Sequence, residues 1–234
     1  MTYVLVHGLG LSANIWSLLT PFLDGEIIVV DLPGHGNSTS KDFSWRGLWQ
    51  SVMDASGLVE WSETIIVLHS FSACLIPEIC AESIRPRNIV FIEGVLQNGD
   101  AVWSSNITHL NEDDFQNWLL RFRSVAEMTL KSQLVTKQSK DRLIEWSNAF
   151  KCVDGNALRN IVINLKKRLS SDLIVKSICN CPFPLLYIKG DNSRLNIDKS
   201  FFSDNRSMSF LSIIGSGHFP MIDNPSQLAK LILQ

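Results

Sequence analysis

The chain has 234 residues, enough for one domain or for one domain that carries an insertion. Apolar residues make up 45% of it and charged residues 19%, which excludes an intrinsically disordered chain. The net charge of −2, from 21 basic and 23 acidic side chains, argues against a protein dedicated to nucleic-acid binding. No apolar run reaches the roughly 18–20 residues that span a bilayer, so we expect no membrane partner.

Six short apolar runs predict β-strands, at residues 2–7, 26–31, 64–69, 88–93, 184–189 and 208–214. The first five are nearly continuous in valine, isoleucine and leucine, which is typical of parallel strands covered by helices on both faces. The last run is interrupted by Ser209 and Ser212, as expected of a strand at the edge of a sheet.

Helical spacing of apolar residues predicts helices between these runs, at residues 13–23, 45–58, 72–84 and 225–233. Strands that alternate with helices indicate an α/β domain with a mostly parallel six-stranded sheet and helices on both faces.

The long segment between the fourth and fifth strands breaks this alternation. Residues 100–181 contain a single glycine and no proline, so helices are the natural interpretation. Asn111 can cap a helix on which Phe115, Trp118, Leu119 and Phe122 share one face. We interpret residues 1–99 and 182–234 as the α/β core and residues 100–181 as a helical insertion.

The cysteines and the N-terminus indicate the compartment. Five cysteines, at positions 74, 80, 152, 179 and 181, lack the paired spacing of a zinc site. An odd number of thiols without a disulfide pattern is typical of a reducing compartment. The chain begins without the basic segment of a signal peptide. We therefore expect a cytoplasmic protein.

A serine stands where the third predicted strand passes into a helix, in Leu68-His69-Ser70-Phe71-Ser72. A hydroxyl on such a turn lies at the carboxyl end of the sheet, and the N–H of Phe71 points into the same space. Ser70 is therefore a candidate nucleophile and the Phe71 N–H a candidate donor to an oxyanion. The alternative is that Ser70 only caps the helix that follows.

Three other strand ends carry glycine-rich turns. The first strand ends in HGLG at positions 7–10, where a flexible turn can aim the Leu9 N–H at the serine. The second strand ends in DLPGHGNS at positions 31–38, and the last in GSGH at positions 215–218. His218 would therefore lie at the same edge of the sheet as Ser70.

In their order and spacing, the segments VLVHGLG, VVDLPGHGNS, LHSFSA and GSGHFPMIDNP resemble the α/β-hydrolase superfamily, in its compact cap-bearing branch. The resemblance implies a Ser–acid–His triad with Ser70 as nucleophile and His218 as general base. It implies an oxyanion hole formed by the N–H groups of Leu9 and Phe71, and a cap formed by the insertion. The superfamily usually opens with two antiparallel strands, and we expect this fold here without those first two strands.

The acid of the triad has two candidates. The superfamily commonly places it three residues after the glycine that ends the next-to-last strand, where this chain has Ser193, and serine cannot hold an imidazolium by charge. Asp191 lies in the same loop. Glu93 ends the preceding strand, from which certain haloalkane dehalogenases and lipases supply the acid, and a buried carboxylate there needs a partner. We favour Glu93.

These residues predict a serine hydrolase that cleaves a carboxylic ester or thioester of a small apolar substrate through an acyl-enzyme. We expect no metal or other cofactor, because neither a metal-binding cluster nor a phosphate loop is visible. Two alternatives stay open: a lyase that uses the same triad as a base, and a non-catalytic receptor for a small ligand. The insertion offers aromatic residues for an acyl pocket, of which we expect most to pack onto the core: Trp103, Phe115, Trp118, Phe122, Trp146 and Phe150.

Overall fold

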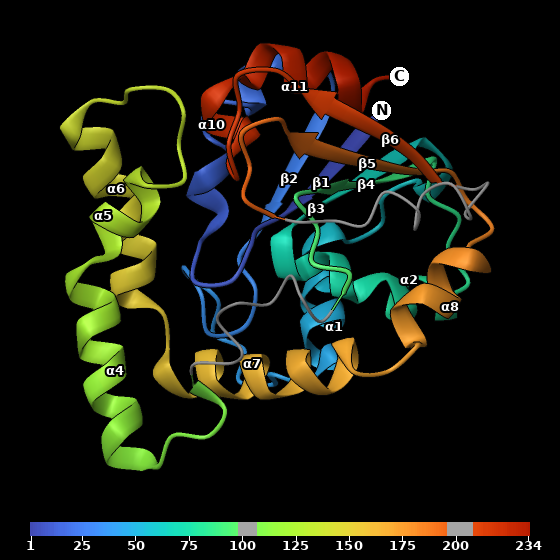
Figure 1. Cartoon of the computed structure of the whole chain (residues 1–234). Helices are drawn as coiled ribbons and strands as arrows, with labels where there is room; N and C mark the ends of the chain where they lie inside the picture. Colours follow the sequence, from blue (N-terminus) through green and yellow to red (C-terminus); the bar gives the residue numbers. More distant parts are fainter. Residues whose placement is uncertain (98–106, 196–207) are drawn as a thin grey trace.

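The computed structural model describes residues 1–97, 107–195 and 208–234. Six parallel strands form a single sheet in the order β2-β1-β3-β4-β5-β6 (Figure 1). The strands are β1 (Thr2–Val6), β2 (Glu26–Val30), β3 (Thr64–His69), β4 (Asn88–Ile92), β5 (Leu185–Gly190) and β6 (Met208–Ile213). The six predicted strands, their parallel direction and the position of the last one at an edge are confirmed.

Side chains of the central strands alternate between two buried clusters, one on each face of the sheet. In β1, Tyr3 and Leu5 belong to one cluster, and Val4 and Val6 to the other. Helices α10 (Pro220–Asp223) and α11 (Pro225–Ile232) contribute to the first cluster. Helices α1 (Trp45–Ser56), α2 (Ile76–Ala81) and α8 (Leu173–Cys179) contribute to the second. Burial on both faces explains why these strands read as continuous apolar runs.

Two predicted helices differ from the observed ones. In place of a helix over residues 13–23 the chain forms two 3₁₀ turns, η1 (Ala13–Trp16) and η2 (Thr20–Phe22). Pro21 lacks an N–H and cannot continue an α-helix from η1. Residues 72–84 divide into the 3₁₀ helix η4 (Ser70–Leu75) and α2. Pro77 lies in the first turn of α2, where its ring avoids the clash it would make inside a longer helix. A further 3₁₀ turn, η3 (Trp61–Glu63), precedes β3.

Helices fill the described part of the segment between β4 and β5, which we call the cap segment (residues 107–181). They are α4 (Glu112–Ser124), α5 (Ala126–Lys131), α6 (Lys140–Cys152), α7 (Gly155–Leu169) and α8. Asn111 caps α4 as predicted, with its Oδ1 accepting a hydrogen bond from the Asp114 N–H at 2.9 Å. The boundary at residues 99 and 100 lies outside the described residues, so the division into core and cap stays a prediction.

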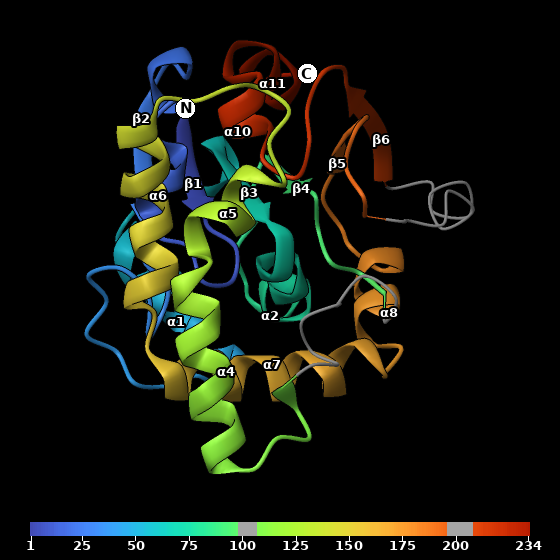
Figure 2. The ribbon, with the colours of Figure 1, turned by 60° about the vertical axis from the view of Figure 1, so that its left-hand side comes forward.

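The first helices of the cap segment lie to one side of the sheet, and α7 lies below it in the view of Figure 1. Helices α4, α5 and α6 stack next to one another, and α7 runs from them toward α8 (Figures 1 and 2). Arg168 of α7 joins this segment to α2, because its Nη1 and Nη2 lie 2.5 and 2.6 Å from the two carboxylate oxygens of Glu78. Its guanidinium also lies 4.2 Å from the centre of the Trp45 ring. No helix in the described part of the chain is long and apolar enough to cross a membrane.

Candidate active site

Ser70 lies on a strained turn at the carboxyl end of β3. Its φ of 56° falls in the left-handed region, which residues other than glycine rarely adopt. His69 is the N-cap of η4, and no side chain makes a capping hydrogen bond there, so the Ser70 hydroxyl is not used as a cap. The turn passes close to Gly8, where a Cβ atom would lie 2.7 Å from His69 Nδ1 and 3.1 Å from Ser70 Cβ. Strain at a partly exposed hydroxyl points to a functional role.

Ser72 lies two residues after Ser70, where the turn passes between β1 and η4. Its side chain is fully buried, and its hydroxyl lies 2.8 Å from the carbonyl oxygen of His69 and 3.2 Å from that of Val6. These contacts satisfy the hydroxyl between β1 and the turn. The buried hydroxyl is therefore hydrogen-bonded, so its burial carries no desolvation penalty from an unpaired group.

Glu93 lies on a second strained turn, directly after β4. Its φ is 51°, and among the described residues Ser70 and Glu93 are the two non-glycine residues with a positive φ. The Glu93 side chain is fully buried. Since β4 pairs with β3 and with β5, this carboxylate enters the site from the strand next to that of Ser70.

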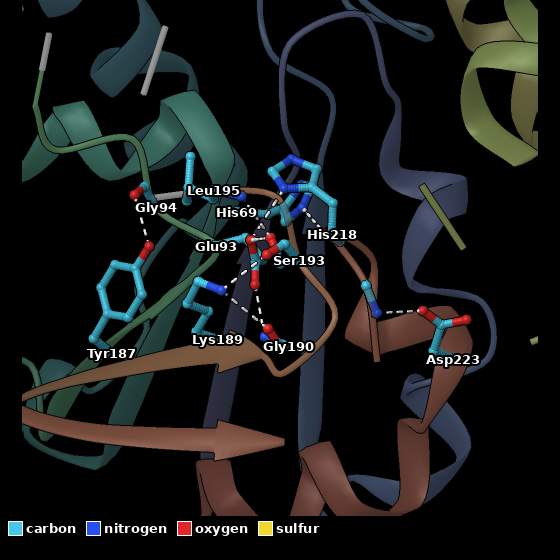
Figure 3. Close-up of polar contacts among 11 residues, drawn as sticks. His69, Glu93, Gly94, Tyr187, Lys189, Gly190, Ser193, Leu195, His218 and Asp223 are labelled. Atoms are coloured by element: carbon cyan, nitrogen blue, oxygen red, sulfur yellow. Dashed lines mark hydrogen bonds and ion pairs between the residues drawn. The ribbon is translucent and has the colours of Figure 1, made fainter. Parts of the chain in front are cut away.

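His218 follows β6 and reaches the Glu93 carboxylate (Figure 3). Its Nδ1 lies 3.2 Å from Glu93 Oε2. Since a carboxylate only accepts hydrogen bonds, Nδ1 carries the hydrogen and Nε2 of the neutral ring is left to accept a proton. The contact predicted for Glu93 is therefore present, whereas its catalytic role stays a prediction.

Asp191, the other candidate acid, faces a different group. It is exposed, and its Oδ1 accepts hydrogen bonds from the N–H groups of Gly215 and Ser216 at 2.9 and 3.2 Å. These bonds hold the turn after β6. The described residues therefore bring Glu93, and not Asp191, into contact with His218.

The backbone of His218 is held from two sides. His69 donates from Nε2 to the His218 carbonyl oxygen at 3.0 Å, and the two imidazole rings are 5.0 Å apart. The His218 N–H donates to the carbonyl oxygen of Gln133 in the cap segment at 3.2 Å. Because His69 immediately precedes Ser70, the first bond joins the loop of the candidate base to the turn of the candidate nucleophile.

Asp223 extends this connection between the His218 loop and the cap segment. Its Oδ2 accepts from the Gly217 N–H at 2.8 Å. Its Oδ1 accepts from the N–H groups of Val135 and Thr136, at 3.0 and 2.8 Å, and from the Thr136 hydroxyl at 2.8 Å. This role of Asp223 could not be predicted from the sequence, because it depends on a cap loop more than eighty residues away.

We expect Asp223→Ala to loosen the His218 loop and the cap loop together. Hydrogen bonds to a charged group contribute about 1.5–3 kcal/mol each, so the free energy of unfolding should fall by about 3 kcal/mol or more. Hydrogen exchange should accelerate both at residues 134–136 and at residues 217–218. The exposed Asp172 provides the control, since Asp172→Asn should change neither region. Faster exchange in only one of the two segments would show that Asp223 does not couple them.

The N–H groups of Leu9 and Phe71, the predicted oxyanion donors, are available. No hydrogen bond joins either of them to another described residue. The peptide groups around Leu9 are fixed: the Gly8 carbonyl accepts from His7 Nδ1 at 2.8 Å, and the Gly10 N–H donates to His35 Nε2 at 3.0 Å. Donors fixed before a reaction suit the stabilisation of developing negative charge.

Three buried histidines surround this region as neutral rings. Burial lowers the pKa of His7 to about 4 and, together with the neighbouring His7, lowers the pKa of His35 to about 3. Burial and the nearby His218 hold the pKa of His69 well below its usual value. The hydrogen bonds that these rings make therefore persist at neutral pH.

These buried histidines predict that stability falls on acidification. The pKa of an unfolded histidine is about 6.5. At pH values between the folded-state pKa and this value, the unfolded chain binds more protons than the folded one. Lowering the pH from 7 to 5 should therefore reduce the free energy of unfolding by about 2 kcal/mol for each of His7 and His35. Urea unfolding at both pH values measures the loss, and His35→Gln should show a smaller decline than the wild type. A free energy of unfolding that is constant over this range would contradict the neutral, buried assignment.

Aromatic side chains of the cap segment reach the turn that carries Leu9. Trp118 stacks on Phe122 with ring centres 5.1 Å apart, and Phe122 meets Phe150 edge-on at 5.6 Å. A Cβ atom on Gly10 would lie 2.8 Å from the Phe150 ring. Most of the predicted aromatic residues are buried, as expected: Phe115, Phe122, Trp146 and Phe150. Trp118 is partly buried and Trp103 lies outside the described residues.

A polar hollow of about 500 Å³ lies elsewhere, between the loop after β2 and the cap segment. Gly34, Lys41, Arg123 and Asp154 are among the residues that line it, and Ser70, Glu93 and His218 are not. We place the candidate active site at Ser70 because its strained turn and that of Glu93 end neighbouring strands at one edge of the sheet. The His218 loop is bonded to the same turn through His69. Among the described residues no group of three or more histidine, cysteine or acidic side chains is arranged to hold a metal ion.

Comparisons with known proteins agree with this architecture. The model of the alpha/beta hydrolase family matches residues 3–231. A bromoperoxidase from Bacillus anthracis is similar over 99% of this chain and 91% of its own, with a TM-score of 0.77 and 16% identity. An esterase from Exiguobacterium antarcticum is similar over 100% and 90%, with a TM-score of 0.75 and 11% identity.

A putative lipase from Acinetobacter baumannii is similar over 99% of this chain and 82% of its own, with a TM-score of 0.73 and 16% identity. At these identities the likeness concerns the fold alone. No curated protein sequence matches the chain.

Proposed function

Since this chain belongs to the alpha/beta hydrolase family, we propose that it is a serine hydrolase that cleaves a carboxylic ester or thioester of a small apolar substrate. One observation carries the proposal. Among the described residues, the two non-glycine residues with a left-handed backbone are Ser70 and Glu93, and Glu93 is bonded to His218. Strain of this kind persists where the surrounding structure holds a reactive group in place.

The first half of the reaction would transfer the acyl group to the enzyme. His218 Nε2 takes the proton of the Ser70 hydroxyl while Ser70 Oγ attacks the acyl carbon. The N–H groups of Leu9 and Phe71 donate to the resulting oxyanion, and removal of one such donor costs about 2.7–4 kcal/mol of activation free energy. His218 then gives its proton to the leaving alcohol or thiol as the bond to the acyl carbon breaks. Glu93 stabilises the imidazolium throughout.

The second half returns the enzyme to its starting state. His218 removes a proton from water, and the hydroxide attacks the acyl carbon bound to Ser70. The proton then passes from His218 to Ser70 Oγ as the carboxylic acid leaves. Two aromatic side chains of the cap segment, Phe122 and Phe150, lie next to Gly10. Their apolar surface on this side of the site favours an apolar acyl group.

A panel of p-nitrophenyl esters and thiophenyl esters with short acyl chains tests the proposal. We expect turnover with an initial burst of leaving group, and an intact mass that increases by one acyl group on Ser70 when the reaction is quenched early. Turnover without any acyl-enzyme would favour the lyase. Saturable binding of these compounds without turnover, with Ser70 and His218 intact, would favour the ligand receptor.

A further inference from the structure

We propose that Ser193 is a positioning residue for the catalytic acid, and that its hydroxyl fixes the Glu93 oxygen that faces His218. The proposal rests on the proposed function in that it takes Glu93 as the acid of the triad. Ser193 stands where the superfamily commonly has its acid, so this chain keeps that position in contact with the triad through a neutral group.

The carboxylate of Glu93 is held by donors from the end of β5 and the loop after it (Figure 3). The Gly190 N–H donates to Oε1 at 2.6 Å. The Ser193 hydroxyl makes a short hydrogen bond to Oε2, the same oxygen that lies 3.2 Å from His218 Nδ1. Ser193 and His218 therefore share one acceptor atom, and the position of that atom sets the orientation of the imidazole.

The direction of the Ser193 hydroxyl follows from its other partner. The Leu195 N–H donates to Ser193 Oγ at 3.2 Å, so the oxygen acts as an acceptor there and its single hydrogen points to Glu93. The backbone of Ser193 is fixed as well, because its N–H donates to the Gly190 carbonyl at 3.1 Å and its carbonyl accepts from Lys189 Nζ at 3.1 Å. A fixed donor of this kind holds the carboxylate in one rotamer.

The contact also distributes the charge of the carboxylate. A donor on Oε2 takes part of the negative charge that would otherwise act on the imidazolium of His218. Among the described residues, the other charged or titratable groups near the pair bond elsewhere. Lys189 binds the carbonyls of residues 190 and 193, His69 binds the His218 carbonyl, and Asp223 binds the Gly217 N–H. Within the described part of the chain, Ser193 is therefore the side chain that adjusts the Glu93–His218 interaction directly.

Ser193→Ala tests this role against a merely structural one. We expect kcat to fall on the order of tenfold, because the carboxylate loses an anchor. The acidic limb of the kcat/KM profile should move to higher pH, because the full charge of Glu93 then acts on His218. Ser193→Thr keeps the hydroxyl and should restore both. A structural role alone would lower the unfolding temperature and leave the pH profile unchanged.

Moving the acid provides a second test that does not depend on the first. Ser193 Oγ contacts Glu93 Oε2, so a carboxylate on residue 193 would reach the space beside His218 Nδ1. We expect Glu93→Gln with Ser193→Asp to be at least about a hundredfold more active than Glu93→Gln alone, a part of the roughly 10⁴-fold that a triad acid can supply. The matched control is Glu93→Gln with Ser193→Asn, which has the same shape without the charge and should give no rescue.

The result that overturns the proposal is a Ser193→Ala enzyme with wild-type kcat and pH profile, together with equal activity of the two double variants. Failure of the proposed function gives a different pattern. If the wild type turns over no ester, the NMR resonance of the His218 Nδ1 proton, assigned by its loss in His218→Gln, still reports the contact. Ser193→Ala should shift that resonance, and an unchanged resonance would contradict the role of Ser193 whatever the reaction is.

Discussion

Replacing Ser70 with alanine should reduce ester turnover by about 10⁶-fold while the fold is retained, because loss of the nucleophile of a triad removes the covalent route altogether. The members of a triad also act as a unit. His218→Gln should therefore cost about as much as Ser70→Ala. Steady-state rates on the best ester of the panel measure the effect, and circular dichroism establishes that each variant is folded.

Two controls separate this result from a general loss of structure. Ser226 is exposed on α11, and Ser226→Ala should keep the wild-type rate. His109 is also exposed, and His109→Gln should cost little activity. A Ser70→Ala enzyme that keeps most of its turnover would refute the assignment of the nucleophile. A loss of about 0.5–2 kcal/mol in stability with no loss of rate would indicate a capping role instead.

Replacing Glu93 with glutamine should reduce turnover by about 10⁴-fold, because an isosteric amide favours the wrong tautomer of the histidine and no longer stabilises the imidazolium. The geometry of the site is otherwise retained. The 3.2 Å contact between Glu93 Oε2 and His218 Nδ1 is the interaction that is lost. Rates of acylation measured in single turnovers would show this loss directly.

Asp191→Asn provides the matched control for the acid, since the same change of charge is made in the neighbouring loop. Asp191 bonds the N–H groups of Gly215 and Ser216, so we expect a modest loss of stability and at most a small loss of rate. If Asp191→Asn were the inactive variant and Glu93→Gln retained its rate, the acid would come from the loop after β5. Retention of activity by both variants would indicate a Ser–His dyad.

The sheet could be predicted from the sequence because its cause is local. Continuous apolar runs such as Ile65–Leu68 are needed wherever helices cover both faces of a strand, and all six runs became strands. The carboxyl ends of parallel strands meet at one edge, which explains why Ser70, Glu93 and His218 could be selected together. The helices after the first and third strands were predicted less well, since Pro21 and Pro77 divide segments whose apolar spacing reads as one helix.

The acid could not be chosen by pattern alone. Glu93 and Asp191 follow adjacent strands, β4 and β5, so both lie at the same edge of the sheet. What separates them is the direction of two side chains, which depends on the positive φ of Glu93 and on the turn that Asp191 stabilises. The contacts of Ser193 and Asp223 depend on residues distant in sequence in the same way. Ser193 did leave a signal, because it stands where the superfamily commonly has an acid.

Reaction with a fluorophosphonate followed by peptide mapping measures whether Ser70 is a nucleophile activated by His218 and Glu93. We expect a single modification on Ser70 in the wild type, none in Ser70→Ala, and a reaction slowed by orders of magnitude in Glu93→Gln and His218→Gln. An unmodified folded wild type, or modification of a residue other than Ser70, would show that Ser70 is not the nucleophile.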